Sequence, residues 1–323
     1  MGRTIVVSAI GGPEVLKLEQ QPALTPKAGE VIVRNEAIGL NFVDVYQRTG
    51  LYKLQLPFTP GGEGVGVVTA VGEGVTGVKA GDRVAYNIAT GAYADEVAVP
   101  AGKTVPLPAG ISTEIAATLV IKGGTAHYLL FETWPVKPGE TILVHAASGG
   151  VGTLLVQWGA AIGARVIGLA GSDEKVDIAR QNGAAFAFNS RQDNWVSKVR
   201  EVTGGKGVDV VYDGVGKVTF EASLDCLRPR GLMVSYGNAS GPVTGVALSM
   251  LQSRGSLYVT RPTSGQYFGT PETLKSTMSA VFDAFTAGRI RPTISQRFSL
   301  ENAADAHRAL EGRETTGASV LVP

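Results

Sequence analysis

The chain has almost no cysteine and almost no net charge. Cys226 is the single cysteine among 323 residues, which excludes an intrachain disulfide and fits a reducing compartment. With 29 basic and 28 acidic residues the formal net charge is +1, so we expect no strong electrostatic field. No cluster of Lys and Arg marks a nucleic-acid surface, and we expect no nucleic-acid partner.

Long apolar runs are missing as well. Residues 151–170 are about as long as a membrane span but contain Gln157, Arg165 and four glycines. The N-terminus starts on a strand pattern, Thr4–Ala9, with no charged segment leading an apolar one, so no signal peptide is predicted. We therefore expect a cytoplasmic protein that does not enter a membrane. The length predicts two domains, each large enough to bury its own core.

One run of small residues carries the clearest signal. The predicted strand Thr141–Val144 leads into Ala147-x-Gly149-x-x-Gly152, and an apolar helix pattern follows. Small residues let the backbone approach a pyrophosphate, and a helix start offers free N–H groups with a partial positive charge. A lone glycine fingerprint is weak evidence because an ordinary strand-to-helix turn has the same pattern. Whether this is a dinucleotide-binding turn or an ordinary one depends on the elements predicted around it.

The segments after this turn alternate between strand and helix patterns. A second strand, Arg165–Ala170, completes a unit of about 30 residues, the length of a βαβ crossover. The further predicted elements are a helix at Asp173–Gln181, a strand at Ala185–Asn189, a helix at Trp195–Val202, a strand at Val208–Asp213, a helix at Phe220–Leu227 and a strand at Gly231–Ser235. This alternation predicts a doubly wound parallel sheet of the Rossmann type that binds a dinucleotide.

The end of the second strand distinguishes NADPH from NADH. An NAD site usually has a carboxylate there for the ribose 2′-hydroxyl, whereas this chain has Gly171 and Ser172. Ser172 can donate a hydrogen bond and Lys175 can supply charge to a 2′-phosphate, so we expect NADPH. Ser172 can equally be the cap of the next helix, with Lys175 solvated.

The segments before and after this region, residues 1–122 and 262–323, lack the alternation of strands and helices. Residues 1–122 show short strands such as Glu30–Arg34 and Gly64–Val68, separated by turns at glycine and proline. The tail after residue 261 has one helix and a last strand, Ala318–Val322, and we expect it to return to the first segment. The predicted domains are therefore 1–122 with 262–323, and 123–261.

Motifs spread over the whole chain resemble a known superfamily. Asn41-Phe42-Val43-Asp44, Gly61–Gly66 and Gly81–Val84 are similar to the medium-chain dehydrogenase/reductase superfamily. Adding Ala146–Gly152, Asp213–Gly216 and Ser235–Asn238 narrows the resemblance to its zinc-independent quinone oxidoreductases. The resemblance implies a mainly-β GroES-like catalytic domain beside the Rossmann domain, with the reaction at the interdomain cleft.

Zinc-dependent members of the superfamily differ at defining positions. Gly62 stands where their zinc-binding histidine lies, and Asn41 falls near their first cysteine ligand. With one cysteine and three dispersed histidines, His127, His145 and His307, zinc cannot be held in their way. We expect no metal and interpret each histidine as structural. A quinone needs less help than an alcohol because its ring becomes aromatic on accepting hydride, so positioning of the two reactants can suffice.

The resemblance also implies site residues, each with a plainer alternative. Tyr46 and Tyr52 are candidates to bind a quinone oxygen, or are ordinary aromatic side chains of the core or rim. Asn41 and Asp44 are expected at the nicotinamide and its ribose, although Asp44 can also be a helix-starting carboxylate. Thr125 is expected near the nicotinamide with Tyr128 one turn further on, or as a helix N-cap.

The remaining candidates come from loops. Gly237 and Asn238 are expected over the nicotinamide, or form a plain turn. Relatives tend to have tyrosine where Ser190 stands, which weakens that position as a cofactor contact. Arg313 can reach the 2′-phosphate or be solvated. The full set of predicted cofactor contacts is Asn41, Asp44, Thr125, Tyr128, Gly149, Gly150, Val151, Gly171, Ser172, Lys175, Ser190, Val215, Gly237, Asn238, Arg261, Pro262, Thr263 and Arg313; the predicted catalytic residues are Tyr46, Tyr52, Asn41 and Thr125.

The function expected is NADPH-dependent reduction of small quinones. Two alternatives stay open: reduction of activated carbon–carbon double bonds in enones, and a non-catalytic crystallin-like protein that binds NADPH or RNA. The apolar pattern Gly255–Thr260 predicts an edge strand of the nucleotide domain, and we expect a homodimer that pairs through it.

Overall fold

The computed structural model describes residues 2–192 and 194–323, which form two compact units. Unit 1 consists of Met1–Gly124, Phe268–Phe282 and Pro292–Pro323, and unit 2 of Thr125–Tyr267 and Asp283–Arg291. Two helices, α3 (Ile121–Tyr128) and α10 (Pro271–Thr286), contribute residues to both units. Among the described residues no helix is long and apolar enough to cross a membrane.

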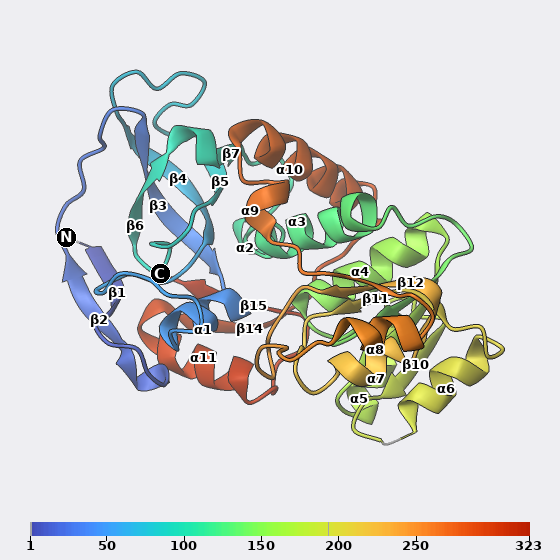
Figure 1. The fold of residues 1–323 in the computed structure, drawn as a ribbon. Coiled ribbons are helices and arrows are strands. Elements are labelled where there is room, and N and C mark those ends of the chain that lie inside the picture. Colours follow the sequence, from blue (N-terminus) through green and yellow to red (C-terminus); the bar gives the residue numbers. More distant parts are fainter. Residues whose placement is uncertain (1, 193) are drawn as a thin grey trace. The chain divides into compact units, whose positions relative to one another are not determined.

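Unit 2 contains a parallel sheet of six strands in the order β10-β9-β8-β11-β12-β13. Three of its strands, β10, β11 and β12, are labelled in Figure 1. Numbered along the chain the six strands run 3-2-1-4-5-6, the order of the Rossmann fold. The strands are β8 (Thr141–Val144), β9 (Arg165–Ala170), β10 (Phe186–Asn189), β11 (Val208–Asp213), β12 (Leu227–Ser235) and β13 (Tyr258–Thr260); the helices are α4 (Gly150–Ile162), α5 (Asp173–Gln181), α6 (Trp195–Val202), α7 (Phe220–Leu224), α8 (Leu248–Ser253) and α9 (Ser264–Tyr267).

The two faces of this sheet bury alternate residues of the same strands. Leu143 and Ile167 pack in one apolar cluster with Trp195 of α6 and Phe220 of α7. Their neighbours Ile142 and Val166 face α4, since a side chain built at Gly159 of α4 would contact both. Helices therefore cover both faces, as the doubly wound prediction requires, and the predicted α/β fold class is confirmed.

Two predicted elements of unit 2 need correction. The helix predicted over Phe220–Leu227 ends at Leu224, because Leu227 already pairs with Val208 as the first residue of β12. The strand predicted over Gly255–Thr260 begins only at Tyr258. Gly255 and Ser256 have φ values of 102° and 57°, a left-handed turn that cannot continue a strand.

Unit 1 is mainly β. A seven-stranded sheet runs β14-β15-β3-β4-β5-β7, with β6 also paired to β3, and β1 and β2 form a separate antiparallel pair. The elements are β1 (Gly2–Val7), β2 (Leu16–Gln21), β3 (Glu30–Gly39), α1 (Phe42–Arg48), β4 (Glu63–Val71), β5 (Arg83–Asn87), β6 (Glu96–Pro100), β7 (Thr104–Pro106), α2 (Thr113–Ala117), β14 (Ile294–Ser299), α11 (Ala303–Glu311) and β15 (Ala318–Val322). The last strand, β15, hydrogen-bonds to β3, so the C-terminal tail does return to the first segment.

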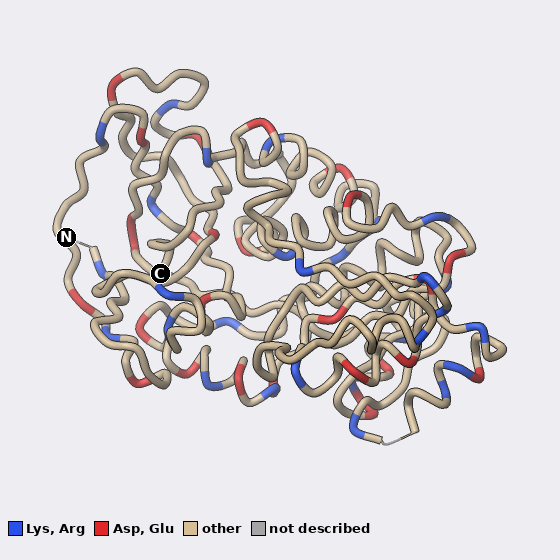
Figure 2. Tube along the Cα trace, viewed as in Figure 1, with Lys and Arg blue, Asp and Glu red and all other residues tan. Residues whose placement is uncertain are grey.

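Charges are distributed without a dominant sign. Basic and acidic positions are interspersed along the trace of each unit (Figure 2). This agrees with the formal net charge of +1 and gives no support to a nucleic-acid surface.

Candidate active site

The glycine fingerprint forms the turn between β8 and α4. Gly149 is the N-cap of α4, and the N–H groups of the first helical turn have no partner within the helix. A Cβ atom on Gly152 would lie 2.1 Å from the carbonyl oxygen of Ala146, so only glycine allows this close approach. The turn thus presents backbone donors at a positive helix end, and it fits a dinucleotide pyrophosphate.

Polar contacts at the end of β9 bring four of the predicted cofactor residues together. Ser172 is the N-cap of α5, and its hydroxyl accepts from the Lys175 N–H at 3.4 Å. Ser190 donates from its hydroxyl to the Ala170 carbonyl at 3.2 Å, next to Gly171. The structure therefore confirms that Ser172 caps α5. The other N–H groups of the first turn of α5 lie beside Ser172 at the end of β9.

Arg191, a basic residue that the sequence analysis missed, lies next to Gly171 at the end of β9. A Cβ built on Gly171 would be 3.8 Å from Nε of Arg191, which is exposed. Burial, together with the charge of Arg191, lowers the pKa of Lys175. Two like charges that repel each other favour an anion between them. The signal for Arg191 was its position directly after Ser190.

The loops after β11 and β12 meet each other at glycines. A Cβ on Gly237 would lie 2.3 Å from the Gly214 carbonyl oxygen. Asp213 holds the first loop, because its Oδ1 accepts from the Val215 N–H at 2.7 Å. Arg261 holds the second, donating to the carbonyls of Ser235 at 2.6 Å and Gly237 at 3.1 Å. The predicted cofactor residues of these loops are thus built into one rigid edge of the sheet.

Asn238 completes this loop pair, and Pro262 and Thr263 follow directly after Arg261. With its amide oriented to suit its neighbours, Asn238 accepts from Nη2 of Arg261 at 2.9 Å. Pro262 is buried, and Thr263 uses its carbonyl to start α9 by accepting from the Gln266 N–H at 3.0 Å. The turn at Gly237 and Asn238 is therefore held by hydrogen bonds to Arg261.

The predicted tyrosines of unit 1 also lie together. The rings of Tyr46 and Tyr52 meet edge to face with centroids 5.3 Å apart, and Phe42 lies 6.1 Å from Tyr46. Tyr46 is buried, whereas Tyr52 is 39% exposed. This aromatic cluster combines apolar ring surface with phenolic hydroxyls, which suits a ligand ring bearing oxygens.

Asn41 begins α1 and binds a buried carboxylate. Its Nδ2 donates to Oε1 of Glu63 at 2.8 Å, and Nζ of Lys122 donates to the same oxygen at 3.1 Å. The backbone N–H of Ile121 donates to Oε2 of Glu63 at 2.6 Å. Glu63 is fully buried, so its three donors replace the water that it has lost. Glu63 lies in the quoted motif Gly61–Gly66, but the sequence analysis assigned no role to Glu63 or to Lys122.

Asp44 is the buried carboxyl of the same helix. Its Oδ2 accepts from the Asn41 N–H at 2.9 Å and from the Tyr93 hydroxyl at 3.0 Å, while Oδ1 is buried without a partner among the described residues. Burial raises the pKa of Asp44 to about 7. Asp44 is thus a carboxyl that starts α1, and its contact with the nicotinamide end stays a prediction.

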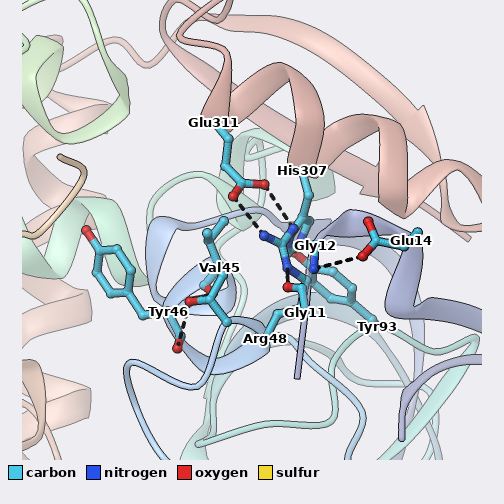
Figure 3. A network of polar contacts seen from close by, with 10 residues as sticks. Gly11, Gly12, Glu14, Val45, Tyr46, Arg48, Tyr93, His307 and Glu311 are labelled. Carbon is cyan, nitrogen blue, oxygen red and sulfur yellow. Dashed lines mark hydrogen bonds and ion pairs between the residues drawn. The ribbon is translucent and has the colours of Figure 1, made fainter. Parts of the chain in front are cut away.

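Tyr93, which donates to Asp44, is itself part of a hydrogen-bonded network with His307, Arg48 and Glu311 (Figure 3). Arg48 has only donors, so His307 Nδ1 accepts from it at 3.2 Å and the ring proton sits on Nε2. Nε2 donates to the Tyr93 hydroxyl at 3.2 Å, and the one hydroxyl proton of Tyr93 goes to Asp44. Glu311 anchors the other end through two bonds to Arg48, at 2.7 and 2.9 Å. This network could not be predicted from the sequence because its members are up to 263 residues apart.

Three further predictions concern α3 and the C-terminal tail. Thr125 lies in the interior of α3 and is buried, so the alternative that it caps the helix is wrong. Tyr128 stacks on Tyr267 of unit 2, with centroids 4.3 Å apart. Arg313 follows α11 in unit 1, with φ 58°, and is exposed. Its contact with the 2′-phosphate stays a prediction.

The residues present do not fit a zinc ion. Within 2–192 and 194–323 no group of three or more His, Cys, Asp and Glu side chains could hold a metal. His145 instead pairs with the Ser223 hydroxyl at 2.8 Å, and His127 lies 3.5 Å from Glu132. Cys226 is buried, which raises the pKa of its thiol to about 12.

Comparison with known proteins agrees with this architecture. Residues 27–109 match the alcohol dehydrogenase GroES-like domain and residues 150–283 the family described as zinc-binding dehydrogenase. The quinone oxidoreductase of Pseudomonas aeruginosa is 50% identical over the full length of both chains. The structure of Escherichia coli quinone oxidoreductase complexed with NADPH superposes with a TM-score of 0.97 and 46% identity, covering 99% of this chain and 100% of that one. A 2-haloacrylate reductase of Burkholderia is 41% identical over 98% of each chain.

Fold and matches together define a medium-chain dehydrogenase/reductase with a GroES-like unit and a Rossmann unit. The chain belongs to the quinone oxidoreductase family, whose members are oxidoreductase enzymes. The glycine turn at α4 and the donors around it fit the dinucleotide that such a fold takes.

Proposed function

We propose that this chain binds NADPH and reduces small quinones without a metal ion, acting in the cytoplasm. The single observation that carries the proposal is the pair of cations, Lys175 and Arg191, at the end of β9, where an NADH site has a carboxylate. The relative from Escherichia coli was crystallised with NADPH, and relatives at about 50% identity are named for quinones.

The chain's own residues supply binding and orientation. The first turn of α4 holds the pyrophosphate, and Ser172, Lys175 and Arg191 hold the 2′-phosphate. In unit 2, Thr125 and the loop at Gly237 and Asn238 position the nicotinamide end. Asn41 and Asp44 of unit 1 remain predicted contacts of the cofactor. Tyr46 and Tyr52 contact the quinone through their rings and hydroxyls. NADPH, when bound, supplies the hydride, and the protein holds the acceptor against it.

The test is loss of absorbance at 340 nm with 1,4-benzoquinone, using NADPH and NADH separately with a chelator present. We expect rapid oxidation of NADPH that the chelator leaves unchanged, and slower oxidation of NADH. Because a charge-assisted hydrogen bond contributes about 1.5–3 kcal/mol, replacing Arg191 or Lys175 by alanine should raise the KM for NADPH roughly 10- to 100-fold. The KM for NADH should stay unchanged.

Lys206→Ala is the matched control, since Lys206 is an exposed cation in the turn before β11. If Arg191→Ala and Lys175→Ala raise both KM values equally, the cations do not read the 2′-phosphate. The 2-haloacrylate reductase among the relatives makes an activated double bond the second candidate acceptor. An enone or haloacrylate reduced faster than benzoquinone would favour that reaction.

We also propose a homodimer that pairs along β13. This strand is the edge of the six-stranded sheet, and its Tyr258 and Val259 are 59% and 37% exposed. An exposed apolar edge strand invites pairing with a second copy. Light scattering on the wild type should give twice the chain mass of 33.5 kDa, and Val259→Lys should give the monomer. A monomeric wild type at micromolar concentration would contradict the dimer.

A further inference from the structure

A buried lysine lies beside the residues proposed to hold the nicotinamide. The Lys122 side chain is 7% exposed and its Nζ lies 3.1 Å from Oε1 of Glu63, whose side chain is 0% exposed. Asn41 donates to the same oxygen at 2.8 Å, and the Ile121 N–H holds the other one at 2.6 Å. The carboxylate is therefore fixed by three donors from two helices, and it fixes the ammonium in turn.

Stability does not explain this ion pair. Removing two charges from water costs several kcal/mol per ion, and a pair of apolar side chains of similar volume is often at least as stable. An ammonium has three N–H donors, and the hydrogen bonds of the described residues use one of them, at Glu63. Two donors of a pre-oriented cation thus remain for an oxygen atom of a ligand.

The proposed reaction needs such a group. Transfer of one hydride to a quinone leaves the hydroquinone monoanion, with its negative charge on an oxygen. One proton on that oxygen completes the hydroquinone. An acid held next to the acceptor oxygen would both stabilise the developing charge and supply the proton.

We infer that Lys122 is the catalytic acid of this enzyme. Its ammonium donates one proton to the oxygen of the reduced acceptor, and the neutral amine that remains regains a proton from water. Glu63 is a positioning residue, since it directs the ammonium, and Asn41 fixes Glu63. This inference rests on the proposed quinone reduction.

The other titratable groups near Lys122 are less suited to this task. Asp44 of α1 interacts with Lys122 electrostatically, but it is fully buried and its Oδ2 already accepts two hydrogen bonds. The Tyr93 hydroxyl uses its proton for Asp44, and burial and the neighbouring carboxylates raise its pKa well above the usual value. Asp44 also keeps a proton up to about pH 7, but its side chain and that of Tyr93 are 0% exposed, whereas the Lys122 side chain is 7% exposed and has donors that Glu63 does not use.

Two variants separate proton donation from a fixed positive charge. Lys122→Arg keeps the cation and the ion pair with Glu63, but a guanidinium does not give up its proton. The double variant Glu63→Gln/Lys122→Met removes both charges, so that no unpaired charge stays buried. Lys17→Met, on the exposed face of β2, is the control.

We expect the single-turnover rate with 1,4-benzoquinone to fall about 100-fold in both variants, the usual effect of losing a general acid. The Kd for NADPH should stay within roughly threefold. The loss should shrink with tetrachloro-1,4-benzoquinone, whose hydroquinone anion is a weak base, and grow with duroquinone, whose anion is a stronger one.

The outcomes separate the inference from the proposed function. A wild-type rate in Lys122→Arg, or an equal loss with all three quinones, would overturn the role of Lys122 as proton donor. A wild type that binds NADPH but reduces none of the quinones would instead overturn the proposed function. Should the double variant fail to fold, Lys122→Arg with the three quinones still decides the question.

Discussion

Gly152→Ala is expected to abolish tight binding of NADPH. The new Cβ would lie 2.1 Å from the Ala146 carbonyl oxygen and 2.8 Å from its carbonyl carbon, and both are backbone atoms that cannot rotate away. The start of α4 must therefore shift relative to the end of β8, which displaces the donors that we propose to hold the pyrophosphate. Hydrogen bonds to a charged group contribute about 1.5–3 kcal/mol each, so losing two of them should raise the Kd by roughly 100-fold or more.

Calorimetric titration with NADPH measures this effect, and denaturant unfolding shows what the clash costs in stability, for which we expect about 1–3 kcal/mol. Gly265→Ala is the matched control, because a Cβ at Gly265 in α9 meets no atom within 4 Å. If Gly152→Ala binds NADPH within threefold of the wild type, the close approach at this turn does not serve the cofactor.

Asp44→Asn is expected to change how stability depends on pH. The folded carboxyl keeps its proton up to about pH 7, whereas the unfolded chain releases it near its ordinary pKa of 3.8. The unfolded state thus binds fewer protons over this interval, and the free energy of unfolding falls as the pH rises from about 4 to about 7. At 1.36 kcal/mol per pKa unit the total loss from Asp44 is about 4 kcal/mol, and above pH 7 it changes no further.

The measurement is denaturant unfolding of the wild type and Asp44→Asn from pH 4 to pH 8. Asparagine can accept the same two hydrogen bonds but does not titrate, so the variant should gain on the wild type across this range. His307, whose pKa burial lowers to about 3, acts in the opposite direction, but it is common to both proteins and cancels in the difference.

Tyr93→Phe provides the matching control for this carboxyl. The Tyr93 hydroxyl lowers the pKa of Asp44, so its removal should extend the loss of stability to higher pH. Parallel curves for the wild type and Asp44→Asn would show that Asp44 is already ionised at pH 4 in the folded protein.

Local patterns were enough for the elements of the Rossmann unit. The ranges predicted for β8, β9, β11, α5 and α6 are those of the structure. Hydrophobic period, small residues and caps are properties of neighbouring residues, so they can be read without knowing the fold. The helix that ran on to Leu227 shows the limit, because a long-range pairing with Val208 ended it.

Some parts of the candidate site could be predicted from neighbouring residues, and others depend on segments far apart in the sequence. The glycine turn at α4 and the cap at Ser172 could be found because each lies within a few consecutive residues. Arg191 and Lys175 are 16 positions apart and become neighbours only because β10 pairs with β9. The proposed contact of Arg191 with the 2′-phosphate therefore could not be predicted before the strand order was known.

By itself, the sequence determined that this protein is an α/β enzyme of the quinone oxidoreductase family with a dinucleotide turn at Gly149–Gly152. Only the tertiary structure decided that Lys122 meets Glu63, 59 residues away, and that Arg48 and His307 hold Tyr93 against Asp44. The physical reason is that a turn or cap depends on the conformation of a few adjacent residues. A buried polar network depends instead on which distant segments exclude water together.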